Sequence, residues 1–453
     1  MNLDNFFKAK SVAIVGVSIN PEKIGHVIFR NFLDANFRGR LFVVNPSVSE
    51  ILGHESYKTV RAIPYHVDLV IVAVPAKLVL SVIKDCGKKN VKDVIIISAG
   101  FEEVGNYKLR DKLKKLLDCY GIRVIGPNCL GTFDAYSKLD SLFLPRYRLT
   151  RPHEGGISFV CQSGAAGSAL LDLASKEGYG FAKFVSYGNA INVDEADIIE
   201  YLGNDKETKV ICLYVEGIKE GNKFVEICKK VSKKKPIIAL KGGTSEAGSK
   251  ATLSHTGSLA GAAEVYEGVF RQCNIIRAHY LEDMFNYARI LEKSIAPRGK
   301  RVQVITNGGG YGILCTDAII ENNLEMAEMD KKVLASLAKQ MPPIVTMKNP
   351  MDLVGDADTN RYKIAIEAAL CDKNVDIILL ILLYQTPLLT PDVINIVTEF
   401  NNQKKKPIIV VSTGGEFTEL LKHSLEETGV PCFTFPEQAV GGIRILCEYY
   451  LKR

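Results

Sequence analysis

Short apolar runs recur along the whole chain, and stretches of mixed polarity separate them. In the first part, runs rich in Val and Ile end at polar or glycine residues, and the amphipathic stretches Val79–Lys89 and Lys108–Tyr120 lie between such runs. Short apolar runs predict buried strands, and longer amphipathic stretches predict helices. The predicted strands are Val12–Val17, Leu41–Asn45, Leu69–Val74, Val94–Ser98 and Ile122–Ile125. This alternation is typical of an open parallel sheet with helices on both faces, so residues 1–135 are predicted to form a Rossmann-like domain.

The same alternation returns twice, each time after a segment rich in proline and basic residues. Leu144–Pro152 and Ala296–Arg301 are predicted to be linkers, because their composition suits an extended crossing between domains. The strands predicted beyond them are Ile157–Cys161, Val210–Val215, Val302–Thr306, Ile377–Leu383, Ile408–Ser412 and Pro431–Phe435. We therefore predict an α/β protein with three open parallel-sheet domains, at residues 1–135, 153–292 and 300–453.

Composition narrows the classes of function. A chain of 453 residues exceeds the size of a single core, which agrees with three domains. Its net charge of +6, without a long basic run or a patch of aromatic and arginine residues, argues against nucleic-acid binding. The 11 cysteines form no CxxC pair and favour a reducing compartment, and the N-terminus has no signal-peptide core. The longest apolar run, Ile377–Tyr384, is too short to cross a bilayer, so we expect a cytoplasmic protein without a membrane span.

Glycine-containing turns follow the predicted strands of the first domain. The turn Gly16–Gly25 resembles a phosphate-binding turn but departs from GxGxxG in its length and its second glycine. Asn45 ends the second strand, where a nicotinamide dinucleotide site usually has Asp or Glu, and this weakens the case for a dehydrogenase. Three more turns, Val74–Ala76, Ser98–Glu103 and Gly126–Gly131, would meet the first at the carboxyl edge of the sheet, where ligands bind. Another adenine nucleotide carrier fits this edge, and so does a Rossmann-like sheet without a ligand.

Two turns rich in Ser or Gly lead into helices in the later domains. Gln162–Ser168 follows the first strand of the second domain, and Asn307–Gly312 follows the first strand of the third. A helix start of this kind presents free N–H groups and the positive end of the helix dipole, which favours a phosphoryl group. An ordinary helix N-cap is the alternative at Ser163.

A histidine among small residues lies between these two turns. His255 stands between a serine and a threonine within Lys250–Gly261, where small side chains leave room beside the ring. An exposed histidine can act as a base, an acid or a nucleophile, and a loop histidine that only hydrogen-bonds its own turn is the other interpretation of the spacing. Glu216 follows the strand Val210–Val215, where a carboxylate could hold an imidazole in one tautomer. Together with the two helix starts, the histidine suggests a phosphoryl group that is gripped from two sides.

Seven motifs, in order along nearly the whole chain, resemble those of a known family. They are the Gly16/Ser18/Lys23/Gly25 turn, Ile125–Asn128, Gln162–Gly164, Val215–Gly217, Ser254–Gly257, Thr306–Gly309 and Asn349–Asp352. As a set they resemble the alpha subunits of ADP-forming acetyl-CoA synthetases, which belong with succinyl-CoA synthetase to the superfamily of NDP-forming acyl-CoA synthetases. The resemblance implies a Rossmann-like CoA-binding domain followed by two flavodoxin-like, succinyl-CoA synthetase-like domains.

The resemblance also implies roles for particular residues. His255 would be the phosphorylated histidine, with Glu216 as its partner. The implied phosphate-binding residues are Ser163, Gly164, Ala165, Gly308, Gly309 and Gly310. The implied CoA-binding residues are Gly16, Ser18, Lys23, Gly25, Asn45, Val74, Pro75, Ser98, Ala99, Gly100, Glu102 and Asn128. Members of the family convert acyl-CoA and phosphate to an acyl phosphate and CoA, and the acyl phosphate then phosphorylates the histidine.

In this family the phosphohistidine passes its group to Mg-ADP on an ATP-grasp domain, and no region of the sequence resembles such a domain. We therefore expect a separate ATP-grasp beta subunit, in an α2β2 heterotetramer, which holds Mg2+ mainly with ADP or ATP. The ligands expected on this chain are CoA, acyl phosphate and phosphate, without a metal site. We expect the segment around His255 to move between the acyl and nucleotide sites, and His26 to lie at the surface. A non-catalytic CoA-binding regulatory protein of the same fold is the alternative.

Overall fold

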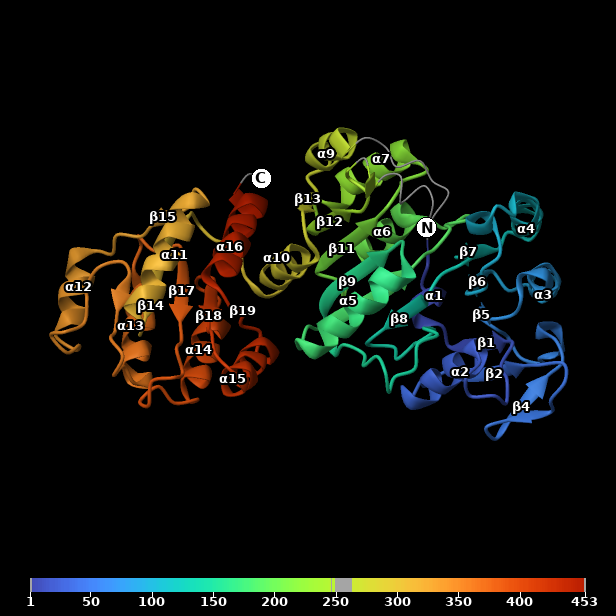
Figure 1. The fold of residues 1–453 in the computed structure, drawn as a ribbon, viewed down its shortest axis with the longest axis horizontal. Coiled ribbons are helices and arrows are strands. Elements are labelled where there is room, and N and C mark those ends of the chain that lie inside the picture. Colours follow the sequence, from blue (N-terminus) through green and yellow to red (C-terminus); the bar gives the residue numbers. More distant parts are fainter. Residues whose placement is uncertain (1, 246, 249–262, 452–453) are drawn as a thin grey trace. The chain divides into compact units, whose positions relative to one another are not determined.

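The computed structural model describes residues 2–245, 247–248 and 263–451. The chain divides into two compact units, Met1–His279 and Tyr280–Arg453, and each is described by itself. The described residues form three sheets, two in the first unit and one in the second (Figure 1). His255 and its neighbours lie outside the described residues.

The first sheet of the first unit has the strand order of a Rossmann domain. The order is β3-β4-β2-β1-β5-β6-β7, and every pair is parallel except β3 with β4. Without β3, the parallel strands follow the order 3-2-1-4-5-6, which reverses between β1 and β5. The elements are α1 (Asn5–Lys8), β1 (Ser11–Val15), α2 (Ile24–Asp34), β2 (Arg40–Val44), β3 (Glu50–Ile51), β4 (His54–Tyr57), η1 (Val60–Ala62), β5 (Leu69–Val72), α3 (Ala76–Lys88), β6 (Asp93–Ile96), η2 (Glu102–Val104), α4 (Tyr107–Tyr120) and β7 (Arg123–Ile125).

The second sheet of this unit is flavodoxin-like. The order is β13-β12-β11-β9-β10-β8, and only β8 runs antiparallel to its neighbour. The parallel strands follow the order 2-1-3-4-5, which reverses between β9 and β11. The elements are β8 (Gly131–Asp134), β9 (Glu154–Cys161), α5 (Gly164–Lys176), β10 (Phe181–Ser186), α6 (Glu195–Asn204), β11 (Val210–Val215), α7 (Gly221–Val231), β12 (Ile237–Lys241), α9 (Ala263–Gln272) and β13 (Ile276–Ala278).

The sheet of the second unit repeats the flavodoxin-like order. Its parallel strands run β15-β14-β17-β18-β19, with β16 also paired to β14, and the order reverses between β14 and β17. The elements are α10 (Leu281–Lys293), β14 (Arg301–Thr306), α11 (Gly309–Glu321), β15 (Glu325–Met326), α12 (Lys331–Ala338), β16 (Met351–Asp352), α13 (Thr359–Cys371), β17 (Ile377–Ile381), α14 (Val393–Asn402), β18 (Ile408–Val411), α15 (Glu416–Glu427), β19 (Cys432–Phe433) and α16 (Pro436–Leu451).

Burial explains why the apolar runs are strands. Every residue of β1, β5 and β17 is buried, as expected for parallel strands that helices cover on both faces. Helix α3 instead buries Val79, Ile83 and Cys86, which share one face at helical spacing, while its remaining residues are more exposed. The two periodicities therefore separate strands from helices as the sequence predicts.

The short helix α1 ties the first two sheets together. It contacts both β6 and β8, and Phe6 and Phe7 are fully buried. The Phe7 ring stacks on Tyr201 at a centroid distance of 5.0 Å. Lys8 pairs at 2.8 Å with Glu207, which lies between α6 and β11. These contacts tie the two sheets of the first unit to each other.

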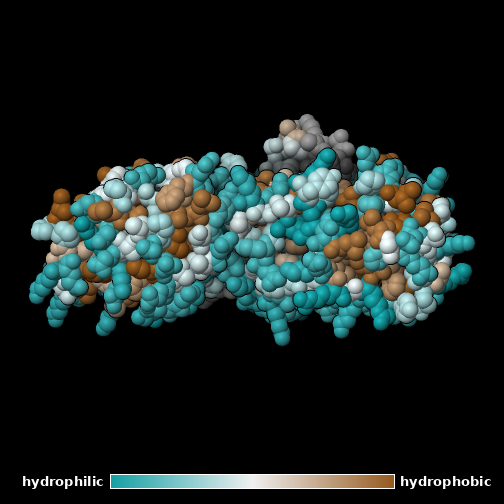
Figure 2. All heavy atoms as spheres, turned by 90° about the horizontal axis from the view of Figure 1, so that it is seen from below, coloured by the Kyte–Doolittle hydropathy of each residue, from teal (hydrophilic) through white to brown (hydrophobic). Residues whose placement is uncertain are grey.

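On the face shown in Figure 2, hydrophilic side chains predominate and apolar ones gather in patches on each unit. In the part of the chain that the structure describes, no helix is both long enough and apolar enough to cross a membrane.

The predicted α/β fold with three open, mostly parallel sheets is confirmed. Two elements are informative about the boundaries, which stay predictions. Strand β8 joins the second sheet although it precedes residue 135. Helix α10 begins at Leu281, before the predicted boundary at residue 292, yet it belongs to the second unit, where it packs on α16.

Candidate active site

A large cavity opens between the carboxyl edges of the two sheets of the first unit. Its volume is about 1640 Å³. It lies at the reversal points of both sheets, since it is lined by the turns after β1 and β5 and by those after β9 and β11. Of the predicted site residues, those that line it are Gly16, Ser18, Lys23, Gly25, Val74, Pro75, Ser98, Ala99, Glu102, Asn128, Ser163, Gly164, Ala165 and Glu216. The turns predicted to bind CoA and one of the two helix starts predicted to bind phosphate thus share one cavity.

The glycine turn after β1 packs backbone against backbone. Gly16 has φ +96°, and a Cβ there would lie 2.4 Å from the Ala73 carbonyl oxygen. A Cβ on Gly25, in the first turn of α2, would lie 2.2 Å from the Gly16 carbonyl oxygen. Only glycine allows the turn, the helix start and the end of β5 to approach this closely. The longer spacing between the glycines therefore performs the packing role of the shorter GxGxxG pattern.

Two polar side chains near this turn, those of Asn45 and His26, make hydrogen bonds within the protein. The Asn45 side chain donates to the Val17 carbonyl at 2.6 Å and accepts from the Ser47 amide at 2.8 Å. Asn45 is not among the cavity-lining residues, and its contact with CoA stays a prediction. The expectation that His26 lies at the surface is wrong, because its side chain is buried and its Nδ1 lies 2.7 Å from the Ser18 carbonyl oxygen.

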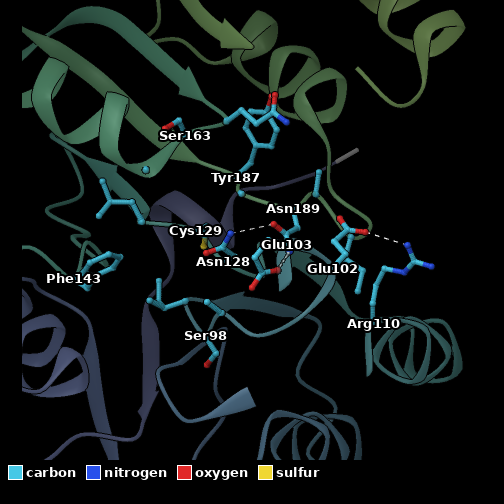
Figure 3. Close-up of a pocket in the computed structure, with 18 of the residues that line it drawn as sticks. Ser98, Glu102, Glu103, Arg110, Asn128, Cys129, Phe143, Ser163, Tyr187 and Asn189 are labelled. Carbon is cyan, nitrogen blue, oxygen red and sulfur yellow. Dashed lines mark hydrogen bonds and ion pairs between the residues drawn. The ribbon is translucent and has the colours of Figure 1, made fainter. Parts of the chain in front are cut away.

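A carboxylate that sequence reasoning missed holds the turn after β6. Glu103 accepts hydrogen bonds from the Gly100 amide, from the Phe101 amide at 3.1 Å and from the Asn189 side chain at 2.6 Å (Figure 3). Burial alone would raise the pKa of Glu103, but these hydrogen bonds outweigh burial and hold the pKa below its ordinary value. Gly100, which we predicted to contact CoA, is not among the cavity-lining residues.

Charged side chains form one end of the cavity. Glu102 pairs with Arg110 at 3.2 Å and with Lys219 at 2.8 Å. Lys219 also donates to the Asn189 carbonyl at 2.8 Å, so this group links η2 and α4 to the second sheet. Figure 3 shows Glu102 and Arg110 on one side of the pocket, with Ser163 and Phe143 on the other. No local spacing in the sequence signals Lys219, because its partner Glu102 lies 117 residues away along the chain.

Asn128 joins the two sheets at the centre of the cavity. It has φ +59°, and its side chain donates to the Asn189 side-chain oxygen at 3.3 Å. A Cβ on Gly188 would lie 2.3 Å from the Asn128 carbonyl oxygen. The turn after β7 and the turn after β10 are therefore packed directly against each other.

The start of α5 is both a capped helix end and a wall of the cavity. The Ser163 hydroxyl accepts from the Ala166 amide at 3.3 Å, which is an ordinary N-cap bond. Ser163, Gly164 and Ala165 nevertheless line the cavity, where the helix dipole favours an anion. A Cβ on Gly164 would lie 3.7 Å from Leu130, an ordinary contact, so this helix start is not crowded by its neighbours. The N-cap and the anion-binding interpretations are compatible.

Glu216 lies across the reversal point from this helix start. It follows β11, is 9% exposed, and accepts a hydrogen bond from Tyr214 at 3.4 Å. Gln162 lies beside it and accepts from the Glu216 amide at 2.8 Å. Burial lowers the pKa of Lys241, at the end of β12, and the charge of Glu216 opposes that shift. The carboxylate thus faces the cavity from a fixed strand end.

Three further titratable side chains, those of Glu195, Tyr187 and Lys223, also line the cavity, and no sequence motif pointed to them. Glu195, in the first turn of α6, is buried, and burial raises its pKa to about 7. Burial also raises the pKa of Tyr187 well above its ordinary value, so its hydroxyl stays neutral. Lys223 pairs with Asp194 at 2.9 Å and with Asp197 at 2.6 Å.

The second predicted phosphate site lies in the other unit. Gly308, Gly309 and Gly310 form the start of α11, at the reversal point between β14 and β17. A Cβ on Gly309 would lie 2.8 Å from an Asp352 carboxylate oxygen, so this helix start has a carboxylate beside it. The grip of one phosphoryl group by both helix starts stays a prediction. The predicted pairing of His255 with Glu216 lies outside the described residues.

Comparison with known sequence families agrees with this architecture. Residues 10–134 match the CoA binding domain family, residues 154–291 match the succinyl-CoA ligase like flavodoxin domain, and residues 302–445 match the ligase-CoA domain. The fold and the cavity therefore define a CoA ligase type of protein with three domains.

Full-length relatives identify the family. The chain is 38% identical over 454 residues to the alpha subunit of acetate–CoA ligase (ADP-forming) II from Pyrococcus furiosus, which covers 98% of this chain and 97% of the relative. It is 39% identical over 448 residues to acetate–CoA ligase (ADP-forming) from Methanocaldococcus jannaschii, which covers 98% of this chain and 63% of that longer relative. The chain belongs to the family of ADP-forming acetate–CoA ligases.

A solved structure supports the same assignment. The dinucleotide forming acetyl-coenzyme A synthetase 1 of Ca. Korarchaeum cryptofilum, in complex with phosphate and ADP, aligns with a TM-score of 0.92 and 35% identity. The alignment covers 99% of this chain and 97% of that chain.

Proposed function

We propose that this chain is the alpha subunit of an ADP-forming acyl-CoA synthetase that interconverts acyl-CoA, ADP and phosphate with a free acid, CoA and ATP. Acetate is the first acid to test, because the relatives are named acetate–CoA ligases. The observation that carries the proposal is the single cavity that joins the turns after β1, β5 and β6 to the start of α5 and to Glu216.

The first step is acyl transfer to phosphate at the start of α5. A phosphate oxygen attacks the thioester carbonyl of acyl-CoA, the C–S bond breaks, and CoA leaves as the thiolate. The backbone N–H groups and dipole of α5 would hold the phosphate without a lysine that binds the product too tightly. The glycine turn at Gly16 and the turns after β5 and β6 would hold CoA, since they line the same cavity.

The second step is phosphoryl transfer to His255. A lone pair of the neutral imidazole attacks phosphorus, the P–O bond to the acyl group breaks, and the free acid leaves as a carboxylate. Glu216 would accept a hydrogen bond from the other ring nitrogen and thereby stabilise the phosphoimidazole. Positioning and fixed dipoles dominate such transfers, which suits a site made of strand ends and a helix start. We propose that the start of α11 and Gly308–Gly310 also bind the phosphoryl group.

The third step requires a nucleotide site from a partner. We propose a separate ATP-grasp beta subunit, in an α2β2 assembly, which would bind Mg2+ with ADP or ATP and accept the phosphoryl group. Relatives named as alpha subunits support a partner of this kind. The cytoplasm is the proposed location, because the cysteines within the described residues are free thiols, which a reducing compartment preserves.

Phosphorylation of the purified αβ complex tests the proposal directly. After incubation with acetyl phosphate, peptide mass spectrometry should find a phosphoryl group on His255. The His255→Ala variant should lose the label and ATP synthesis, and the control His66→Ala should keep both, since the His66 side chain is 80% exposed and lies outside the cavity.

Two outcomes would contradict this function. An unlabelled wild-type complex that binds CoA would favour the non-catalytic regulatory protein. Full ATP synthesis by His255→Ala would exclude the phosphohistidine route.

A further inference from the structure

Gln162 links the end of β9 to the end of β11 at the edge of the cavity. Its side-chain oxygen accepts hydrogen bonds from the Glu216 amide at 2.8 Å and from the Gly217 amide at 3.1 Å. Because two N–H groups meet the same oxygen, the amide orientation is determined by its partners. The Gln162 backbone amide also donates to the Tyr214 carbonyl at 3.1 Å. Both the backbone and the side chain of Gln162 are therefore hydrogen-bonded to the end of β11.

These hydrogen bonds join two parts of the sheet that are far apart in the sequence. Gln162 follows β9 directly and precedes Ser163, the N-cap of α5. The bonds therefore cross the reversal point of the sheet and join the proposed phosphate-binding helix start to the strand end that carries Glu216. Gln162, Ser163 and Glu216 all line the cavity.

We propose that Gln162 is a positioning residue that sets the placement of the Glu216 carboxylate relative to the start of α5, and that it acts on the phosphoryl-transfer step. The inference rests on the function proposed above. Acyl transfer from CoA to phosphate uses the helix start and the CoA turns, whereas stabilisation of a phosphoimidazole uses Glu216. Loss of the Gln162 oxygen should therefore slow the second step selectively.

A purely structural role is the competing explanation, and the second unit shows what such a role looks like. Asn307 holds the equivalent place after β14, and its side chain accepts from the Leu383 amide and donates to the Leu383 carbonyl, both at 3.0 Å. There an amide side chain holds a strand end without any carboxylate at that end. A purely structural role for Gln162 predicts an equal loss of both half-reactions.

The test uses Gln162→Met, which keeps the length of the side chain and removes its oxygen. In the complex with the ATP-grasp partner, two rates are measured, namely acyl phosphate formation from acetyl-CoA and phosphate, and protein labelling by 32P-acetyl phosphate. Labelling should slow by about 10- to 100-fold, the usual consequence of a small misplacement. Acyl phosphate formation should stay within about threefold of wild type, because the helix start is unchanged.

A second variant, Gln162→Glu, restores the oxygen acceptor and adds a charge. It should label faster than Gln162→Met, and the acid limb of its labelling rate should move to higher pH, because the added carboxylate favours the protonated forms of nearby groups. Equal loss of both half-reactions in Gln162→Met, wild-type labelling in that variant, or a Gln162→Glu variant as slow as Gln162→Met with an unmoved acid limb would each overturn the inference.

The failure of this inference is distinct from failure of the proposed function. If the wild-type complex labels on His255 while Gln162→Met behaves as wild type, only the inference is lost. If the wild-type complex does not label at all, the proposed function is lost first.

Discussion

The two flavodoxin-like sheets place the same local sequence pattern in different surroundings. Gln162-Ser163-Gly164 and Asn307-Gly308-Gly309 each run from the end of a first strand into a helix, at the reversal point of the sheet. In the first unit, the amide side chain holds the strand end at Glu216. In the second, it holds the strand end at Leu383.

The electrostatics of the two helix starts differ as well. The start of α5 lines the cavity. A Cβ built on Gly164 would make an ordinary contact there, with Leu130 at 3.7 Å. The start of α11 has Asp352 against Gly309, and the Asp352 carboxylate accepts a hydrogen bond from the Val354 amide at 2.9 Å. A nearby carboxylate weakens the attraction of the helix dipole for an anion, so the phosphoryl group proposed to bind at both helix starts should bind more weakly at α11 than at α5. The same pattern therefore gives an open helix start in one unit and a charge-balanced one in the other.

The largest expected effect concerns the carboxylate at the first reversal point. Glu216→Gln keeps the shape of the side chain but removes the charge that would stabilise the phosphoimidazole. We expect labelling of His255 by acetyl phosphate to slow by about 100-fold or more, while CoA binding measured by calorimetry is unchanged. Labelling at the wild-type rate would show that Glu216 is no more involved in catalysis than Leu383 is.

The next prediction compares how much the side chains of Asn307 and Gln162 contribute to stability. Asn307 is 3% exposed, and Asn307→Leu would leave the Leu383 amide and carbonyl without their partner. We expect a loss of about 2–4 kcal/mol in the second unit. Gln162→Met should lose only about 1 kcal/mol in the first unit, since water in the cavity can replace the lost acceptor. Hydrogen exchange of each unit in urea measures both values, and equal losses would contradict the comparison.

A pH-dependent effect is expected from the buried carboxyl in the wall of the first cavity. The pKa of Glu195 rises from 4.5 to about 7, so the folded protein binds a proton that the unfolded chain has released, and stability falls as the pH rises through that window. Glu195→Gln should therefore match wild type at pH 5 and be more stable by about 2 kcal/mol at pH 8. Thermal denaturation at both pH values measures this, and a variant less stable at pH 8 would indicate an ionised, paired Glu195.

The smallest effect compares the first residue of each helix. Gly309→Ala would bring a Cβ to 2.8 Å from Asp352 and should destabilise the second unit by about 1 kcal/mol. Gly164→Ala makes only ordinary contacts, the nearest with Leu130 at 3.7 Å, and should change stability by less than about 0.5 kcal/mol. Gly310→Ala, with no atom within 4 Å of its Cβ, is the control within α11. Urea denaturation of the three variants should give this order.

Particular residues show how far the sequence could lead. The turns at Gly16, Val74, Ser98 and Asn128 were predictable, because each follows an apolar run and the ends of parallel strands meet at one edge. The role of Glu103 was not predictable, although it stands beside Glu102. Its hydrogen bonds with the Asn189 side chain and with the Phe101 amide become visible only in the fold. Gln162 belonged to a recognised motif, but nothing local shows that its oxygen faces Glu216.

The sequence by itself determined the order of strands, turns and helices and the chemical type of each turn, because short-range patterns of apolar and polar residues carry that information. Only the tertiary structure decided that the carboxyl edges of the first two sheets face one cavity, and that Lys219 and Gln162 meet partners far along the chain there. The reason is physical. Burial and sheet pairing choose these contacts after the elements form, and residues that meet across a reversal point share no spacing in the chain.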